Sequence, residues 1–458
     1  MRGDDRRRGA PTRTRLLALR VLERVQRAGA FADIALNHAL GRSGLSAPDR
    51  AFATELVYGT LRWRGRIDYL LEQCLDRDLE KLEPLVATAL RLGAYQLLFT
   101  DGVPATAAVD ESVRCVRAAG VERATGLVNA VLRRLAAEHT RIPLPKLDSD
   151  PVAHLVHALS LPRWIAERWL EVFGPAEASA LARASNEQPP LTVRVNRQRQ
   201  SVAELLADVS ERFPDAVPCR LARDGIQLGR RGNPGLDPGF LSGHFTVQDE
   251  ASQLVVGLLD PAPGERVLDV CAAPGGKATA IAERIGDKGR VLALDRHKGR
   301  LGLVSRSARR LGLDNIDCLE RDATRPLVDL AGAPFDRVLI DAPCTGLGTL
   351  RRHPDARWRV QPGDPDQLAA IQAALLRSAA EVVKPGGTLV YSTCTVLPEE
   401  NEWIVEAFLK STPNFELSAP GEIPAEVRTV VDGNRALRCL PHHHDADGFY
   451  AARLERRT

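Results

Sequence analysis

The chain has 458 residues, of which 44% are hydrophobic and 26% charged; this is the composition of an ordinary globular protein, and at about 150 residues per domain it suggests roughly three domains. No run of about 18 or more apolar residues occurs, which excludes a membrane-spanning helix, and the N-terminal RGDDRRRGAPTRTR lacks the apolar core of a secretory signal, so a cytoplasmic protein is expected. Its 8 cysteines include no CxxC pair, which excludes a zinc ribbon and a dense disulfide framework.

The net charge of +3 is distributed unevenly along the chain. Residues 1–140 carry 22 basic and 17 acidic side chains, whereas residues 241–458 carry 27 and 30. The positive excess therefore lies in the first third. Because phosphate contacts need a local basic patch rather than a high overall charge, the weak net charge does not exclude nucleic acid as a partner.

The first third is predicted to be helical, after a basic arm at residues 1–13 that we expect to be disordered. From residue 14 apolar side chains recur at helical spacing, with little of the alternation that marks strands. The turn-rich segments GRSGLSAPDR and TDGVPAT interrupt this pattern. We therefore predict an all-α bundle over residues 14–140, with helical patterns at 14–40, 48–75, 81–99 and 105–137.

The next segment, residues 141–240, is predicted to hold a linker and a small α/β module. The proline-bearing IPLPKLDSDP has the composition of a linker. Helical patterns near 163–173, 176–185 and 201–209 surround the alternating segment LTVRVN at 191–196. This mixture indicates a module with both helices and strands.

Residues 241–458 are predicted to form a doubly wound parallel sheet. Short apolar runs alternate with helical lengths, as expected for strands that are covered by helices on both faces. The predicted strands are RVLDV (266–270), RVLALD (290–295), NIDCLE (315–320), RVLID (337–341) and TLVYST (388–393). Because such sheets bind ligands beyond the carboxyl ends of their strands, the residues at those ends are the candidates for a site.

The first three predicted strands end in features that suit a nucleoside. The first runs into the loop CAAPGGKA, and the chain contains neither GxGxxG nor GxxxxGK[ST], so the dinucleotide fingerprint and the P-loop are absent. Asp295 is placed to accept hydrogen bonds from ribose hydroxyls, and Asp322 from an adenine amino group. A nucleoside-bearing cofactor without pyrophosphate fits, and S-adenosylmethionine is such a cofactor. The alternative is that each aspartate caps the following helix.

Two cysteines directly follow the fourth and fifth predicted strands. Cys344 lies in DAPCTGLGTLRRHPD and Cys394 in YSTCTVLPEEN. Both stand in turns flanked by Pro, Ser or Thr, where the usual role of cysteine as a small buried apolar side chain fits poorly. Because a thiolate is a strong nucleophile, both are candidates for catalysis.

These motifs carry a resemblance to a known family. DVCAAPGGK, LIDAPCTGLGTLRRHPD and YSTCTVLPEEN together resemble the RNA cytosine-5 methyltransferases of the NOL1/NOP2/Sun family. The segments FADIALNHAL, DRAFATELVYGTLRWRGRID and GLVNAVLRR resemble the NusB-like RNA-binding domain that precedes the catalytic domain in bacterial Sun-type enzymes. The resemblance implies a Rossmann-like class I methyltransferase domain that uses S-adenosylmethionine. It also implies methylation of 16S ribosomal RNA at cytosine 967 in standard rRNA numbering.

The resemblance further implies separate roles for the two cysteines. Methylation at cytosine C5 needs a thiolate to add at C6; the family's motifs assign this attack to Cys394 and release of the RNA adduct to Cys344. Cytosine-5 DNA methyltransferases use the cysteine of the PC motif for attack, so the reverse assignment is the alternative. Asp341 is expected to hydrogen-bond the cytosine edge, and Lys277 to neutralise charge near the base or the methionine carboxylate. The expected cofactor-binding residues are Cys271, Ala272, Ala273, Pro274, Gly275, Gly276, Lys277, Asp295, Asp322 and Asp341.

Basic residues outside these motifs are candidates for RNA contacts. They are Arg194 in the small module and Arg351, Arg352 and His353 next to the catalytic motif; solvated charged loops are the alternative. The histidine run in PHHHDADGFY (441–450) lacks supporting ligands at metal spacing, so we expect a hairpin loop and no metal.

The expected partner is RNA, either 16S rRNA or the small-subunit particle, with no membrane and no DNA, and the protein is expected to be a monomer. Three alternatives stay open at this point. The first is the same chemistry on transfer RNA or another rRNA site, because the catalytic motifs do not encode the target. The second is a NusB-like RNA-binding factor with an inactive methyltransferase domain. The third, a Rossmann dehydrogenase, is disfavoured by the missing GxGxxG.

Overall fold

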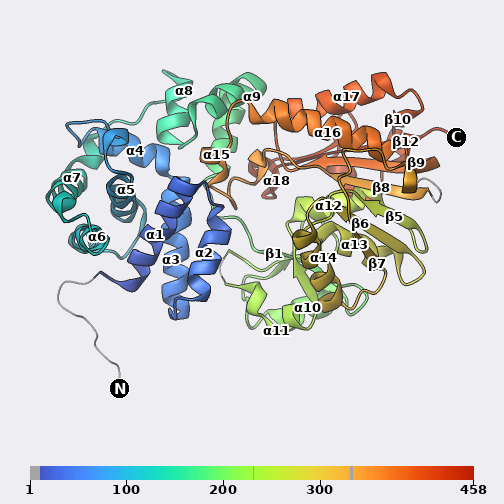
Figure 1. Ribbon diagram of the computed structural model, residues 1–458, viewed down its shortest axis with the longest axis horizontal. Coiled ribbons are helices and arrows are strands. Elements are labelled where there is room, and N and C mark those ends of the chain that lie inside the picture. Colours follow the sequence, from blue (N-terminus) through green and yellow to red (C-terminus); the bar gives the residue numbers. More distant parts are fainter. Residues whose placement is uncertain (1–10, 231, 331–333) are drawn as a thin grey trace. The chain divides into compact units, whose positions relative to one another are not determined.

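The computed structural model describes residues 11–230, 232–330 and 334–458, which form two compact units. Of these described residues, the first unit holds those up to Glu187 together with Leu350–Gln361, and the second holds those from Gln188 to Thr349 together with Pro362–Thr458. Most of the predicted arm at residues 1–13 lies outside the described residues. The first unit is helical, and the second holds both sheets (Figure 1).

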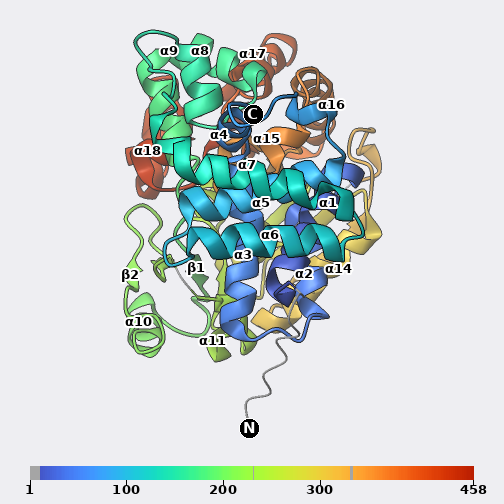
Figure 2. The same cartoon turned by 90° about the vertical axis from the view of Figure 1, so that its left-hand side faces the viewer.

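The helical unit is built around a buried central helix, α5 (Pro84–Phe99). A proline opens this helix at a position where no intrahelical N–H is needed, and its side chains from Val86 to Gln96 are buried on all sides. Figure 2 shows α6 and α7 beside it, and their apolar faces join the same core. The other helices of this unit are α1 (Arg13–Ala28), α2 (Ala32–Gly41), α3 (Ala47–Arg62), α4 (Arg64–Glu72), α6 (Ala105–Ala118), α7 (Thr125–Glu138), α8 (Pro151–Ala153), α9 (Arg163–Ala184) and α15 (Ala356–Arg359). The predicted all-α bundle is confirmed.

Three of the four predicted helical runs are divided in the structure. The run at 14–40 breaks at Gly29 (φ 59°), and the run at 105–137 breaks at Gly120 (φ 87°). Both glycines adopt the left-handed conformation that ends helices and that other residues adopt only at a cost. The run at 48–75 breaks at Trp63, whose φ and ψ of −100° and 12° are not helical.

The segment Leu350–Gln361, which we call the strap, belongs to the helical unit although it follows the Cys344 motif in the sequence. It contains α15, in which the Arg357 side chain is 0% exposed. Burial lowers the pKa of Arg357 to about 9. Its guanidinium donates to the backbone oxygens of Arg62, Ser160 and Ser185 and to Oδ1 of Asn186. The strap is therefore an integral part of this unit.

The small module in the second unit is an antiparallel sheet with one packed helix. The strand order is β2-β3-β1-β4. Helix α10 (Val202–Val209) begins with a reciprocal capping box between Ser201 and Glu204, and it packs Leu205 against the sheet. The strands are β1 (Thr192–Val195), β2 (Val217–Pro218), β3 (Gly225–Gln227) and β4 (Phe245–Val247), and the short α11 (Pro238–Leu241) precedes β4.

The large sheet of the second unit has eight strands in the order β10-β12-β9-β8-β5-β6-β7, with β11 paired to β12. Strands β5 to β9 are parallel to one another, and β12 runs antiparallel to β9. All predicted strands occur, and the predicted doubly wound parallel arrangement is confirmed for β5 to β9. The strands are β5 (Arg266–Asp269), β6 (Arg290–Asp295), β7 (Ile316–Glu320), β8 (Phe335–Asp341), β9 (Val383–Thr393), β10 (Phe415–Leu417), β11 (Ala436–Cys439) and β12 (Phe449–Arg456).

Helices cover both faces of this sheet (Figure 1). Alternate strand residues enter different cores, because side chains alternate across a strand: Val267 packs with one group of helices and its neighbour Leu268 with the other. The first group is α12 (Glu250–Leu259), α13 (Gly276–Ile285) and α14 (Lys298–Leu311), and the second is α16 (Asp364–Ala380) and α17 (Glu402–Ser411). Burial of both faces explains why the central strands β5, β6 and β8 contain continuous apolar runs.

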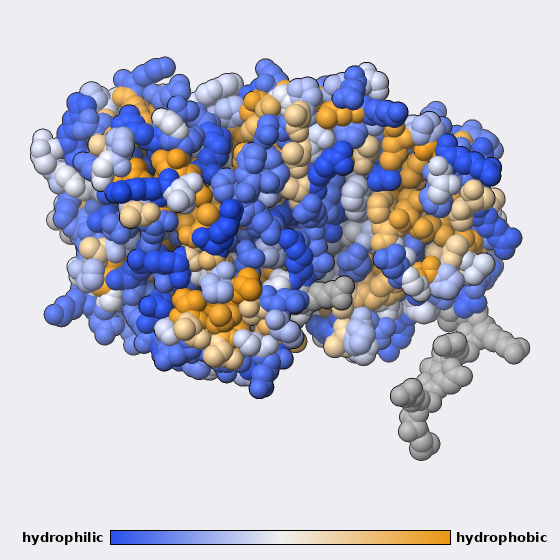
Figure 3. Space-filling view, turned by 180° about the vertical axis from the view of Figure 1, so that it is seen from behind, coloured by the Kyte–Doolittle hydropathy of each residue, from blue (hydrophilic) through white to orange (hydrophobic). Residues whose placement is uncertain are grey.

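Hydrophilic side chains dominate the surface seen in Figure 3, with smaller apolar patches between them. Among the described residues, no helix combines the length and apolar character that crossing a membrane requires.

Candidate active site

The predicted site residues gather at the carboxyl edge of the large sheet. Strand β5 ends at Asp269, β6 at Asp295 and β8 at Asp341, and these strands run parallel in register. Cys344 and Cys394 follow β8 and β9, which also pair in parallel. Backbone bonds from Val270 to Leu339 and from Ala342 to Ser392 hold the first residues beyond these strands together.

The glycine loop after β5 turns tightly against α14. Gly275 has φ 110°, and a Cβ there would come within 3.0 Å of Cα of Val304, so the turn requires glycine. The amide of Ala272 donates to the oxygen of Leu294 in β6 (2.8 Å). Arg300 donates to the oxygen of Ala273 (2.9 Å). The loop is thus held beside the end of β6 with the N-terminus of α13 directly behind it.

Asp295 and Asp322 are neighbours at this edge, but the side chain of each also accepts a hydrogen bond from a residue two positions further along the chain. The amide of Arg321 donates to the oxygen of Asp295 (3.1 Å). Oδ1 of Asp295 accepts from the amide of His297 (2.9 Å), and Asp322 accepts from the amide and hydroxyl of Thr324, which lower its pKa. The helix-start alternative therefore explains part of their bonding, while a carboxylate retains further acceptor capacity for a ligand.

Asp269 is a buried carboxylic acid that the sequence analysis did not assign to the site. Its side chain is 0% exposed, and neither oxygen has a hydrogen-bond partner of standard geometry among the described residues. Burial, reinforced by the nearby charge of Asp341, raises its pKa to about 7. Protonation near neutrality removes the cost of a buried unpaired charge.

Asp269→Asn is expected to raise the thermal unfolding midpoint of the cofactor-free protein more at pH 8 than at pH 5. The folded state holds a proton that the unfolded state releases near pH 3.9. The resulting destabilisation therefore grows as the pH rises from about 4 and is complete above about 7, and asparagine removes it. Asp317→Asn, at an exposed position in β7, is the control. If Asp269→Asn changed the thermal unfolding midpoint equally at pH 5 and pH 8, the pKa of Asp269 would not be raised.

Lys277 and Asp341 form an ion pair between the start of α13 and the end of β8. Nζ of Lys277 donates to Oδ2 of Asp341 at 2.7 Å and lies 5.0 Å from the ring centroid of Phe449. Ser392 donates to the other oxygen of Asp341 (3.0 Å). Lys277 is only 8% exposed, so it is not the solvated lysine of a helix's first turn. The pair places a cation and an oriented carboxylate at the same edge as the cysteines.

The two cysteines face each other. Their Sγ atoms are 3.3 Å apart, both thiols are free and half-buried, and the amide of Cys394 donates to Sγ of Cys344 (3.3 Å). The hydrogen bond with Cys394, together with burial, raises the pKa of Cys344 well above its usual value. The thiol of Cys344 therefore resists ionisation.

A buried polar network around Glu400 joins the two cysteine loops, and the sequence analysis did not find it. Glu400 ends the short helix η8 (Pro398–Glu400) and is 0% exposed. It accepts from the amide and hydroxyl of Thr345 and from Nε2 of Gln372. Glu400 belongs to the YSTCTVLPEEN motif, but spacing alone does not show that it folds back toward Cys344.

The structure argues against two of the predicted RNA contacts. Arg194 is 4% exposed, pairs with Glu283 at 2.8 Å and donates to the oxygen of Gly276, so its guanidinium supports the start of α13 rather than reaching solvent. Arg351, in the strap, is 2% exposed. Arg352 is half-buried and His353 exposed, so phosphate contacts by these two stay predictions.

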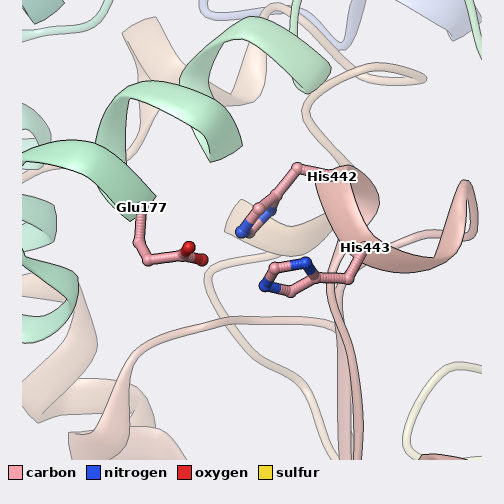
Figure 4. Close-up of side chains that lie close together, drawn as sticks. All are labelled: Glu177, His442 and His443. Atoms are coloured by element: carbon pink, nitrogen blue, oxygen red, sulfur yellow. The ribbon is translucent and has the colours of Figure 1, made fainter.

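The histidine run forms the short helix α18 (Pro441–His444) in the connection between β11 and β12, which pair as a hairpin. Figure 4 shows the rings of His442 and His443 next to each other, with centroids 4.1 Å apart. Glu177, also drawn there, belongs to the helical unit, whose position relative to α18 is not determined. The expectation of no metal at these histidines stays a prediction.

Three families match consecutive parts of the chain. The NusB family matches residues 12–137, a ferredoxin-like domain of RsmF/B-like methyltransferases matches residues 161–233, and the family described as 16S rRNA methyltransferase RsmB/F matches residues 256–455. These matches follow the order of helical bundle, small module and large sheet.

Similar proteins cover nearly the whole chain. A probable ribosomal RNA small subunit methyltransferase B from Synechocystis sp. is 40% identical over 450 residues, covering 96% of this chain and 99% of that protein. The ribosomal RNA small subunit methyltransferase B of Pseudomonas putida is 38% identical over 408 residues, covering 89% and 90%. Among solved structures, PH0851 superposes with a TM-score of 0.80 at 27% identity, covering 97% of this chain and 99% of that chain.

Proposed function

Because the chain belongs to the RsmB/F family of 16S rRNA methyltransferases, we propose that it methylates C5 of a cytosine in 16S rRNA, C967 in standard numbering, through a covalent cysteine adduct. The observation that carries the mechanism is the pair of free thiols 3.3 Å apart at the sheet edge that also bears the glycine loop. The substrate is naked rRNA or a small-subunit particle, and the enzyme acts as a cytoplasmic monomer.

The thiol pair supplies what methylation at C5 requires. Cytosine C5 is a poor nucleophile until a thiolate adds at C6, which makes C5 enamine-like. Cys394 forms the bond to C6, C5 takes up the methyl group, and C5 then loses its proton as the C6–S bond breaks and the Cys394 thiolate is restored. Cys344 handles the proton in this elimination. Cys344 first gives its own proton to solvent and then accepts the C5 proton as a thiolate, and its raised pKa makes that thiolate a stronger base.

S-adenosylmethionine, when bound, supplies an electrophilic methyl group, and residues at this edge suit its parts. The turn Cys271–Lys277 leads into the N-terminus of α13, where a carboxylate is favoured. Asp295 and Asp322, held together by the Arg321 amide, suit ribose hydroxyls and an adenine amino group. Residues Cys271, Ala272, Ala273, Pro274, Gly275, Gly276 and Lys277, with Asp295, Asp322 and Asp341, are the proposed binding set.

Asp341 and Lys277 are the groups proposed to act on the base. Addition at C6 places negative charge on the ring, and a positive charge that is already oriented, here the Lys277 ammonium, stabilises it without reorganisation. Asp341 is oriented by Lys277 and Ser392, so its carboxylate can accept from the cytosine amino group while Lys277 balances charge. The target base must be splayed from its stack to reach these groups.

Methyl transfer from labelled S-adenosylmethionine is expected for undermodified 16S rRNA or the small-subunit particle and not for transfer RNA. Each RNA is incubated with the protein under identical conditions and the incorporated label is counted. Label in transfer RNA alone would favour the same chemistry on another target. Absence of label from every RNA would favour an RNA-binding factor with an inactive catalytic domain.

A further inference from the structure

The buried carboxylate of Glu400 holds the loop on both sides of Cys344. Thr345, the next residue after Cys344, donates its amide (2.9 Å) and its hydroxyl (2.5 Å) to Glu400. Gln372 in α16 donates to Glu400 (3.1 Å) and also to the oxygen of Pro343, the residue before Cys344 (2.9 Å). Glu400 and its partner Gln372 therefore hold the backbone on each side of the thiol.

The same network reaches the loop that carries Cys394. The hydroxyls of Thr345 and Thr395, which each follow a cysteine, lie 2.8 Å apart. Asn401, the residue after Glu400, donates to the oxygen of Thr395 (3.2 Å). Tyr391 in β9 donates to the backbone oxygen of Glu400 (2.5 Å). Both cysteine loops are thus tied to one short segment, Glu400–Asn401.

We propose that Glu400 is a positioning residue that holds the Cys344 and Cys394 thiols opposite each other for adduct formation and release. Its carboxylate accepts hydrogen bonds from Thr345 and Gln372, so it acts on the thiols through the residues that flank them. A buried carboxylate is costly unless its acceptor sites are filled, and here donors from two different elements fill them. The role rests on the covalent mechanism proposed above.

Glu400 also acts on Cys344 through its negative charge. It contributes to raising the pKa of Cys344, after the larger effects of Cys394 and of burial. Burial raises the pKa of Glu400 itself, against the effect of its hydrogen bonds from Thr345 and Gln372.

Closure of a Cys344–Cys394 disulfide measures the alignment of the loops without any RNA. Diamide accepts the two electrons and two protons that the thiols lose as the S–S bond forms, and closure requires the sulfurs to approach within about 2 Å. We expect Glu400→Ala to slow closure by about tenfold or more, because the loops lose their common tie. The rate of disulfide closure in Glu400→Gln is expected to stay within about threefold of that of the parent protein. The glutamine amide can accept from Thr345 and Gln372 and donate to the Thr345 hydroxyl. Glu406→Ala, at an exposed position in α17, is the matched control.

The same variants are then assayed for methyl transfer. Glu400→Ala is expected to lower kcat by about 10²-fold, as a small misplacement of reacting groups does, with binding of S-adenosylhomocysteine unchanged and with Glu400→Gln restoring most of the rate. Thr345→Val, which removes the hydroxyl that joins Glu400 to Thr395, provides the test if Glu400→Ala does not fold.

Two results would overturn the positioning role. The first is a rate of disulfide closure and a kcat equal to those of the parent protein in Glu400→Ala, or in Thr345→Val if Glu400→Ala does not fold. The second is an equal loss of closure rate and kcat in Glu400→Gln and Glu400→Ala. Failure of the parent protein itself to methylate RNA would instead refute the proposed function. The disulfide measurement distinguishes the two cases, because it does not depend on activity.

Discussion

Cys344→Ala is expected to accumulate a covalent complex between the protein and its RNA. Cys394 still attacks C6 and methyl transfer still proceeds, but elimination lacks the thiol 3.3 Å away that handles the proton. Turnover is expected to fall by about 10²- to 10⁴-fold, the usual contribution of proton transfer by a positioned side chain. The complex is measured as a band of reduced mobility on a denaturing gel, formed with S-adenosylmethionine and undermodified 16S rRNA.

The control for this trap is the double variant Cys344→Ala/Cys394→Ala, which has no thiol to form the adduct and should give no shifted band. A trap formed by Cys394→Ala and not by Cys344→Ala would contradict the assignment. It would give Cys344 the nucleophilic role that the corresponding cysteine has in DNA cytosine-5 methyltransferases.

Cys394→Ala is expected to abolish methyl transfer. Without a thiolate at C6 the cytosine ring is not activated, and removal of a catalytic nucleophile lowers kcat by about 10⁴-fold or more. Cofactor affinity should be preserved, because the glycine loop and Asp295 are held by β5, β6 and α14 and not by the loop that carries Cys394. The measurement is a single-turnover assay alongside a binding titration with S-adenosylhomocysteine.

Cys318→Ala, at an exposed cysteine in β7, is the matched control and should behave as the parent protein. Methylation by Cys394→Ala at more than about one hundredth of the parental rate would be incompatible with a nucleophilic role for this residue.

The large sheet could be predicted because its signal is local. The central strands β5, β6, β8 and β9 each contain an apolar run of a few residues, and helices pack on both faces of the sheet. The helical bundle was predictable as a whole, with its breaks at residues 41–50 and 100–106, but the breaks inside the predicted runs were not. A helical run continues through Gly29 and Gly120 if only apolar spacing is considered, and the left-handed conformation that ends the helices there appears only in three dimensions.

The burial of Arg194, Arg351 and Arg357 was the main feature that could not be predicted from the sequence. In the strap, Arg351 and Arg357 stand in the charged segment RRHPDARWR, which is typical of a solvated loop, and yet both side chains are buried. Arg194 is likewise satisfied by Glu283, 89 residues further along the chain. Only tertiary contacts provide the carbonyl and carboxylate acceptors that make such burial tolerable.

Part of the candidate site could be predicted because its residues follow strands. Parallel strands bring their carboxyl ends to one edge, and there the structure places Lys277 against Asp341 and Cys344 against Cys394. Glu400 escaped prediction because its role depends on η8 folding back toward Thr345, 55 residues earlier. Asp269 escaped because its complete burial without a hydrogen-bond partner among the described residues depends on tertiary packing.

The most direct test of the proposed function is to locate the methyl group in the product. The protein is incubated with S-adenosylmethionine and undermodified 16S rRNA, and the RNA is digested and analysed by mass spectrometry for the modified nucleoside and its position. The account predicts 5-methylcytosine at C967 with the parent protein and none with Cys394→Ala. A methyl group on any other atom or base, or 5-methylcytosine formed equally by Cys394→Ala, would contradict it.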